Sequence, residues 1–163
     1  MTETSIINDF SILIGTVNGS GSQTANLTIM RALFKMGIPV SGKNIYPSNI
    51  QGMPTWYEIR ISKEGYSARK PTPDIVIAMC DDSFEEDEQA VSPGGVLIFD
   101  DGIRKEPVRE DITLYPIPVR KIVREGDVPG TLRTYVANMV YVGVLAQLLG
   151  INFDLLKEAL AYH

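Results

Sequence analysis

The sequence predicts an α/β fold, a Rossmann-like three-layer sandwich in which helices cover both faces of a mostly parallel sheet. Three observations point to it. Apolar strand-like segments alternate along the chain with segments of helical character, which is typical of α/β folds. Residues 74–79 and 96–99 form apolar runs, as expected of strands buried inside a parallel sheet. A glycine-rich turn at 15–22 joins a short apolar strand, 11–14, to a helix-like run, 23–36.

The remaining strands are expected from their composition. Residues 37–42 predict the end of the first helix and a short second strand, and a polar loop follows at 43–54. In 55–62 apolar and polar residues alternate, which predicts a half-buried strand that is antiparallel or at a sheet edge. A last strand is expected at 112–118, so the predicted strands alternate with helices through most of the chain.

Three further helices are expected, at 81–91, 131–149 and 153–161, with a basic amphipathic segment at 120–124. The acidic run 85–88 lies near a helix start, where negative charge is favourable, and predicts a solvated face rather than a metal site. Thr131 is the expected N-cap of the long helix, and Gly150 is its expected stop.

Length and composition predict a single domain over residues 1–163. The chain is 44% apolar and 21% charged, which are globular values. The net charge of −5 argues against nucleic acid or an anionic membrane as a main partner. The polar, acidic start does not resemble a signal peptide, and the apolar stretch 135–149 is too short to span a bilayer, so a cytoplasmic location is expected.

The cysteine and histidine counts restrict the chemistry. The chain has one cysteine, Cys80, and one histidine, His163, so it can form neither an internal disulfide nor, by itself, a zinc site or a cysteine-ligated iron–sulfur cluster. No catalytic constellation is apparent, and the predicted site contains no metal ligand. A binding role is therefore expected for this chain.

The turn at 15–22 is the strongest candidate for a binding site. Glycine lets the backbone approach a ligand closely, and the helix that follows offers unpaired N–H groups and a positive dipole end. The expected guest is an anion, such as a phosphate. A plain strand–helix turn is the alternative, because glycine-rich turns alone are weak evidence.

The turn differs from the two commonest phosphate motifs. Its glycines, Gly15, Gly19 and Gly21, do not follow the G-x-G-x-x-G order, and no lysine ends it as in a P-loop. About 20 residues further on, where an NAD-binding fold places an acid, the chain has Lys43. A base at this position disfavours NAD and suits a ligand with an additional phosphate, a description that NADPH and coenzyme A both meet.

Two segments add a resemblance to a known family. Residues 17–26 (VNGSGSQTAN) and residues 36–57 are similar to the gamma domain of the 2-oxoacid:ferredoxin oxidoreductases, in particular the type fused in front of the alpha domain, as in 2-oxoglutarate synthases. Residues 73–77, 94–98 and 138–143 also fit that family. The resemblance covers nearly the whole chain.

The resemblance implies a function and a division of labour. These enzymes decarboxylate a 2-oxoacid, such as pyruvate or 2-oxoglutarate, oxidatively with coenzyme A, giving an acyl-CoA, CO2 and reduced ferredoxin. The gamma domain helps to bind coenzyme A and packs against the alpha and beta partners, which carry thiamine diphosphate and the iron–sulfur clusters. Coenzyme A contacts are implied for Thr16, Val17, Asn18, Gly19, Ser20, Gly21 and Ser22, with Lys43 and Asn44 as further phosphate ligands.

Other functions remain open at this point. The chain could be a binding or assembly module of the same fold, or an NADPH-binding reductase domain. The long loop 44–56 contains apolar residues and predicts association, either with alpha and beta partners or as a homo-oligomer of the isolated chain.

Overall fold

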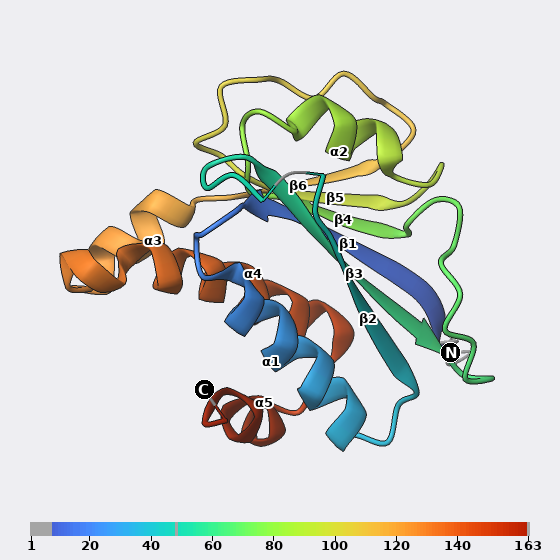
Figure 1. The fold of residues 1–163 in the computed structure, drawn as a ribbon. Coiled ribbons are helices and arrows are strands. Elements are labelled where there is room, and N and C mark those ends of the chain that lie inside the picture. The colour runs from blue at the N-terminus through green and yellow to red at the C-terminus, as the bar shows by residue number, and fades with distance from the viewer. Residues whose placement is uncertain (1–7, 48, 163) are drawn as a thin grey trace, which may run out of the picture.

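The computed structural model describes residues 8–47 and 49–162, and its centre is a six-stranded mixed sheet (Figure 1). The strand order is β2-β3-β1-β4-β5-β6. The β1–β4, β4–β5 and β5–β6 pairs are parallel, whereas β1–β3 and β2–β3 are antiparallel. The strands are β1 (Asp9–Val17), β2 (Val40–Ile45), β3 (Pro54–Ser62), β4 (Ile75–Ala78), β5 (Val96–Asp100) and β6 (Thr113–Ile117).

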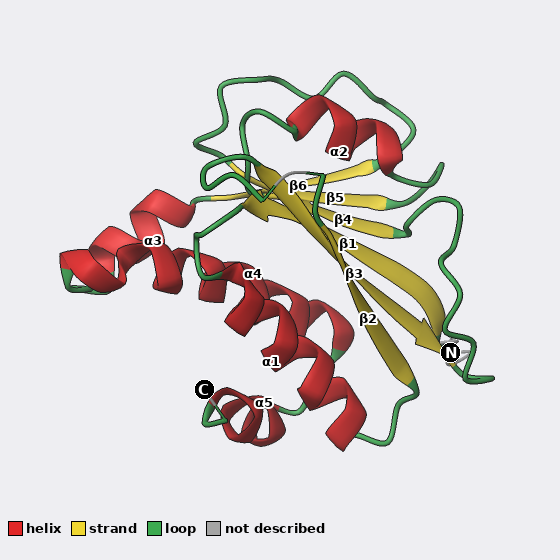
Figure 2. Ribbon diagram, viewed as in Figure 1, coloured by secondary structure: helices red, strands yellow, loops and turns green. Residues whose placement is uncertain are grey.

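Helices cover both faces of this sheet (Figure 2). Helices α1, α4 and α5 lie on one face, and α2 lies on the other with the loop that follows β5. The predicted three-layer α/β sandwich with a mostly parallel sheet is therefore confirmed. The helices are α1 (Ser22–Lys35), α2 (Phe84–Ala90), α3 (Val119–Glu125), the short 3-10 helix η1 (Gly130–Leu132), α4 (Arg133–Leu149) and α5 (Phe153–Leu160).

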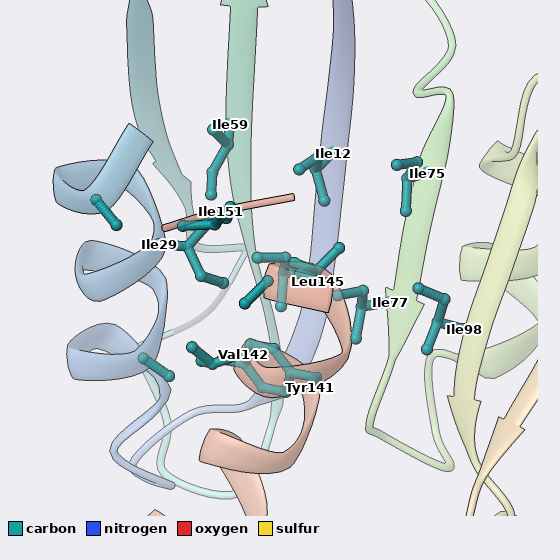
Figure 3. Packing of buried hydrophobic residues seen from close by; sticks show 14 of the residues in the cluster. Ile12, Ile29, Ile59, Ile75, Ile77, Ile98, Tyr141, Val142, Leu145 and Ile151 are labelled. Atoms are coloured by element: carbon teal, nitrogen blue, oxygen red, sulfur yellow. The ribbon is translucent and has the colours of Figure 1, made fainter. Parts of the chain in front are cut away.

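The main core lies between the sheet and the layer of α1, α4 and α5 (Figure 3). Side chains that alternate along the strands point into it, including Ile12 of β1 and Ile77 of β4. Ile29 of α1 and Leu145 of α4 meet them from the helical layer, and all four are fully buried. This packing fixes α1, and with it the turn that precedes α1, against the end of β1.

Strand β3 differs from its prediction. It is antiparallel as expected, but it lies between β2 and β1 instead of at an edge, and both of its faces are buried. The charges on its second face are covered by partners, because Glu58 pairs with Arg69 and Arg60 pairs with Asp9. The prediction of a half-buried strand is therefore wrong, because the polar half of the alternation contacts protein instead of solvent.

Helix α2 also departs from its prediction. Glu85 and Glu86 are exposed, but Asp87 and Glu88 are 0% and 1% exposed. Glu88 turns inward and accepts the backbone N–H groups of Val108 and Arg109, at 2.6 and 2.7 Å. The prediction of a solvated acidic face is correct for the first two residues of the run and wrong for the last two.

Helix α4 is continuous with η1, so the helical run is longer than the apolar stretch 135–149 that was expected to be too short to span a bilayer. The run Gly130–Leu149 has 20 residues and a mean hydropathy of 1.2, which meets the length and composition of a membrane span, although core helices meet the same criteria. Counting only 135–149 was wrong, because the helical run begins earlier. Thr131 lies inside η1 and is not a cap, whereas Gly150 ends α4 in the left-handed conformation, with φ of 63°, as predicted.

Candidate functional site

The glycine-rich turn lies where the carboxyl end of β1 meets the N-terminus of α1 (Figure 1). Gly19 and Gly21 both have positive φ, at 86° and 81°. Side chains other than glycine rarely adopt such a conformation, which explains the residue type at both positions. The Ser20 N–H donates to the Val17 carbonyl at 3.1 Å and closes the turn. We call residues 16–22 the anion loop.

Neighbouring segments hold the anion loop in place. The backbone N–H of Asn18 donates to the Met53 carbonyl at 2.8 Å, and the Gly52 N–H donates back to the Asn18 carbonyl at 3.0 Å. From the other side, the Asn138 side chain of α4 donates to the Ser20 carbonyl at 2.9 Å. The conformation of the loop is therefore set by the β2–β3 connection and by α4 together.

Two cavities flank the anion loop. The first, of about 300 Å³, is lined by aromatic side chains and by polar ones that include Gln23, Asn26 and Thr55. The second, of about 470 Å³, lies toward β4, β5 and α4, where Asp100 and Thr134 line it. Thr16, Asn18 and Gly19 line both cavities, so the loop is the wall between them.

Most of the predicted site residues line these cavities. All seven residues of the anion loop line at least one of the two. Asn44 lines the first cavity from β2. Lys43 is exposed, pairs in register with Glu58, and is not among the residues that line either cavity. Because successive side chains of a strand alternate between faces, Lys43 belongs to the opposite face of the sheet from Asn44.

The electrostatics of the anion loop come from backbone groups. Gly21 is the N-cap of α1, no side chain caps the first turn, and no acid lies in it. The N–H groups and the positive dipole end of this 14-residue helix therefore lack a carboxylate partner at that end. The buried hydroxyl oxygen of Ser20 also has no hydrogen-bond partner among the described residues. These groups suit a ligand that accepts hydrogen bonds.

A buried carboxylic acid supports the strand that leads into the loop. Asp87 of α2 accepts the Trp56 indole N–H at 2.6 Å and the Ser83 hydroxyl at 2.9 Å. Its carboxyl group lies over Gly15, where a Cβ atom would come within 2.6 Å of an Asp87 oxygen. Burial raises the pKa of Asp87 to about 7, against the lowering effect of the Trp56 and Ser83 hydrogen bonds.

Reasoning from the sequence missed several residues of the site. Tyr135 of α4 lines the first cavity, and its ring occupies the space that a Cβ at Gly21 would need. Asn138 is 4% exposed and holds the loop, and Asn26 accepts the hydroxyl of the buried Tyr141 at 2.8 Å. The one signal in the sequence was an asparagine, Asn138, within an otherwise apolar helix.

The described residues contain no candidate metal site. No group of three or more His, Cys, Asp or Glu side chains in residues 8–47 and 49–162 could hold a metal ion. Cys80 is buried, and His163 lies outside the described residues.

Fold and loop together define a Rossmann-like α/β domain with a divided ligand cavity at the carboxyl edge of its sheet. Residues 11–163 match the family described as pyruvate ferredoxin/flavodoxin oxidoreductase. Because the match covers most of the chain, the chain belongs to that family. The resemblance to the 2-oxoacid:ferredoxin oxidoreductases is thereby confirmed at the level of the family.

Individual relatives agree with this assignment. The chain is 30% identical over 100 residues to 2-oxoacid:ferredoxin oxidoreductase 2, subunit alpha, of Aeropyrum pernix, an alignment that covers 61% of this chain and 16% of the relative. The 2-oxoglutarate:ferredoxin oxidoreductase of Magnetococcus marinus, solved with 2-oxoglutarate, coenzyme A and succinyl-CoA bound, is similar in structure, with a TM-score of 0.76 at 25% identity. That match covers 94% of this chain and 27% of the other, so the chain spans a small part of both relatives.

A free-standing gamma subunit has the same fold. The gamma subunit of a keto/oxoacid ferredoxin oxidoreductase from Geobacter sulfurreducens superimposes with a TM-score of 0.75 at 17% identity, over 94% of this chain and 86% of the subunit. At this identity the match shows that the two chains share their fold.

Proposed function

We propose that this chain is the gamma domain or subunit of a 2-oxoacid:ferredoxin oxidoreductase and that the anion loop, with Asn44, contributes to the binding of coenzyme A. The observation that carries the proposal is the uncapped N-terminus of α1, which opens between two cavities at the carboxyl edge of the sheet. Helix N-termini in this position bind phosphate groups through backbone N–H donors. The diphosphate of coenzyme A supplies the acceptors. Lys43 stays an untested phosphate ligand.

The Magnetococcus relative supports the choice of ligand. That protein was solved with coenzyme A and succinyl-CoA bound, and its similarity to this chain extends over 94% of this chain. In the proposed reaction a 2-oxoacid and coenzyme A give an acyl-CoA and CO2, and ferredoxin accepts the electrons. This domain holds and orients coenzyme A and contributes no catalytic residue. Thiamine diphosphate and the iron–sulfur clusters belong to the alpha and beta partners, and the assembly works in the cytoplasm.

Exposed apolar surface supports an assembly role beside the binding role. In the connection between β2 and β3, Tyr46, Ile50 and Met53 are 55%, 63% and 44% exposed. Large apolar side chains gathered in one loop mark an interaction site more often than an isolated one does. We therefore propose that this loop contacts the alpha or beta partner, or a second copy of the chain when it is isolated.

Two measurements test the proposal. Calorimetry of the chain with coenzyme A and with NADPH separates the leading function from a reductase, because a coenzyme A-handling domain binds the first ligand and not the second. Binding of NADPH alone would contradict the proposal. The absence of binding to either ligand, together with assembly on the partners, would favour the pure assembly module.

A second test concerns activity. The purified chain, supplied with thiamine diphosphate, coenzyme A and an artificial electron acceptor, is expected to show no turnover of pyruvate or 2-oxoglutarate, and activity is expected to return when the partners are added. Turnover by the chain alone would overturn the division of labour between this domain and its partners.

A further inference from the structure

Four of the eight arginines form ion pairs with carboxylates, and three others form none within the part of the chain that the structure describes. Among the described residues, Arg60, Arg69, Arg104 and Arg109 each form an ion pair with an Asp or Glu. Arg31 lies over the Tyr162 ring, 5.5 Å from its centroid. The remaining three arginines of the chain form no ion pair within residues 8–47 and 49–162, and they are Arg120, Arg124 and Arg133.

These three arginines line one cavity of about 430 Å³ between α3 and α4. Arg120 and Arg124 are four residues apart on α3 and so share a helix face, while Arg133 begins α4. All three side chains are exposed, and like charges at this spacing repel weakly, so a bound anion would relieve the repulsion. Val119 and Val123 form the buried floor of the cavity.

The arginine cavity is continuous with the second cavity of the anion loop. Both are lined by Asp100, Val119, Thr134 and Ala137, so one groove runs from the loop along α4 to the guanidinium groups. Asp100 is the one acid in this shared wall, and its Oδ1 accepts the Gly102 N–H at 2.9 Å. Arg120 packs over Gly102, where a Cβ atom would come within 2.9 Å of its Nε.

We infer that Arg120, Arg124 and Arg133 form a second anion subsite, which binds the ribose 3′-phosphate of coenzyme A while the anion loop binds the diphosphate. The inference rests on the proposed function and concerns the ribose 3′-phosphate, the part of the ligand that is not assigned to the anion loop. A phosphate monoester carries up to two charges, and guanidinium groups bind phosphate oxygens through paired N–H donors. The anion loop has backbone donors but no cationic side chain in its cavities, so the two subsites divide neutral and charged recognition.

The same geometry explains why Lys43 is poorly placed for this phosphate. Lys43 lies on β2, at the far edge of the sheet from α3, and lines neither cavity of the loop. Arg124 lies in the groove that begins at the loop. The base that distinguishes coenzyme A from dephospho-coenzyme A therefore comes from α3 and not from β2.

The test compares ligands that differ by one phosphate. Calorimetry measures the affinities of coenzyme A, dephospho-coenzyme A and adenosine 3′,5′-bisphosphate for the wild-type chain and for Arg124→Gln and Arg133→Gln. Lys121→Gln is the matched control. Lys121 is exposed on α3 and does not line the cavity, and its substitution removes one positive charge, as the arginine substitutions do. Lys43→Ala is measured beside it.

Each arginine variant is expected to weaken coenzyme A about tenfold or more, as loss of a charge-assisted hydrogen bond does, and to leave dephospho-coenzyme A nearly unchanged. Lys121→Gln and Lys43→Ala are expected to bind like the wild type. Thermal unfolding of each variant shows whether it is folded, and Arg124→Lys, which keeps the charge, is expected to restore part of the affinity.

The outcomes separate this inference from the proposed function. If coenzyme A binds and the arginine variants bind it as the wild type does, the subsite is refuted and the proposed function stands. If the bisphosphate binds through the arginines but coenzyme A does not bind, the proposed function fails, and the arginines are an anion site that does not serve coenzyme A. No binding of any of the three ligands refutes both. Weaker assembly with the partner subunits, at unchanged coenzyme A affinity, assigns the arginines to an acidic partner surface and refutes the subsite.

Discussion

Replacing Asp87 by Asn is expected to remove a large pH dependence from the stability of this domain. Asp87 is fully buried beneath Gly15, and burial raises the pKa of its carboxyl group to about 7 in the folded chain. In the unfolded chain the same group has its ordinary value of 3.8. Folding therefore favours the protonated form, and an asparagine imitates that form in shape and in lack of charge.

The sign and the size follow from linkage. Since the folded pKa is the higher one, the stabilising contribution is fully present below pH 4 and is lost as the pH rises toward 7. The difference of about three pKa units, at about 1.4 kcal/mol each, gives a loss of about 4 kcal/mol between pH 4 and pH 7. Above pH 7 the contribution of Asp87 to the unfolding free energy of the wild type no longer changes with pH. The variant is expected to show none of this decline and to be the more stable protein at pH 8.

Urea unfolding of the wild type and of Asp87→Asn at intervals from pH 4 to pH 8 measures the difference directly. Glu86→Gln is the control, because Glu86 is exposed on the same helix and its loss also removes one negative charge. The control is expected to keep most of the wild-type decline. Parallel free-energy curves for the wild type and Asp87→Asn would refute the buried, protonated carboxyl group.

Three further predictions concern the loop, the core and the surface. Gly19→Ala is expected to cost about 1–2 kcal/mol in unfolding free energy through its positive φ and to raise the KM for coenzyme A more than that for the oxoacid. Gly65→Ala, with φ of 77° and open space around its Cβ position away from the loop, should cost stability alone. Equal effects of Gly19→Ala on both KM values would refute the loop assignment. Tyr141→Phe is expected to lose about 1 kcal/mol in urea unfolding, because Asn26 loses its buried hydroxyl partner, and no loss would show that this bond does not stabilise the core. Leu148 lies on the half-exposed outer face of α4. Leu148→Glu is expected to weaken association with the partner subunits, measured by gel filtration, while the monomer stays folded. Unchanged association would show that this face is not part of the interface.

The sequence predicted the fold well because its main signals are local. Continuous apolar runs placed the buried parallel strands, and the glycines at 19 and 21 placed the turn at the end of β1. Breakers such as Gly150 placed the end of α4. Each of these signals depends on the chain's own backbone conformation or on the burial of one contiguous segment.

The errors arose where residues elsewhere in the chain decide whether a charged side chain is buried. Alternation in β3 suggested a solvated face, but Arg69 lies 11 residues after Glu58 and covers it. Asp87 was read as part of a solvated acidic run, whereas Trp56, 31 residues away, donates to it inside the protein. A pattern within one segment shows which residues share a face, and it does not show what covers that face.

Part of the candidate site was predicted from the sequence, and part was missed. All residues of the anion loop lie in one stretch of sequence, so a glycine-rich turn was enough to find them. The arginines of α3 and α4 are about 100 residues from the loop, and the basic segment 120–124 gave no indication of where it would lie. Lys43 was chosen by sequence distance from the loop, a rule that holds where a second parallel strand follows the first helix. Here β2 joins the sheet antiparallel to β3 at the far edge, which places Lys43 away from the cavities.

The topology thus connects the strand order to the chemistry. Strand β3 runs antiparallel to β1, whereas β4, β5 and β6 run in the same direction as β1, so the carboxyl ends of β1, β4, β5 and β6 gather at the edge of the sheet that carries the anion loop. The segment that leaves β6 at that edge is α3, which carries two of the three arginines that line the arginine cavity. In the proposed binding mode, a ligand with its diphosphate at the N-terminus of α1 meets the guanidinium groups of α3 and α4 along this groove, whereas no cationic side chain of the described residues lines the two cavities of the loop. Under the proposed function, the 3′-phosphate end of coenzyme A faces the arginines, and the thiol end extends toward a partner that carries the reaction.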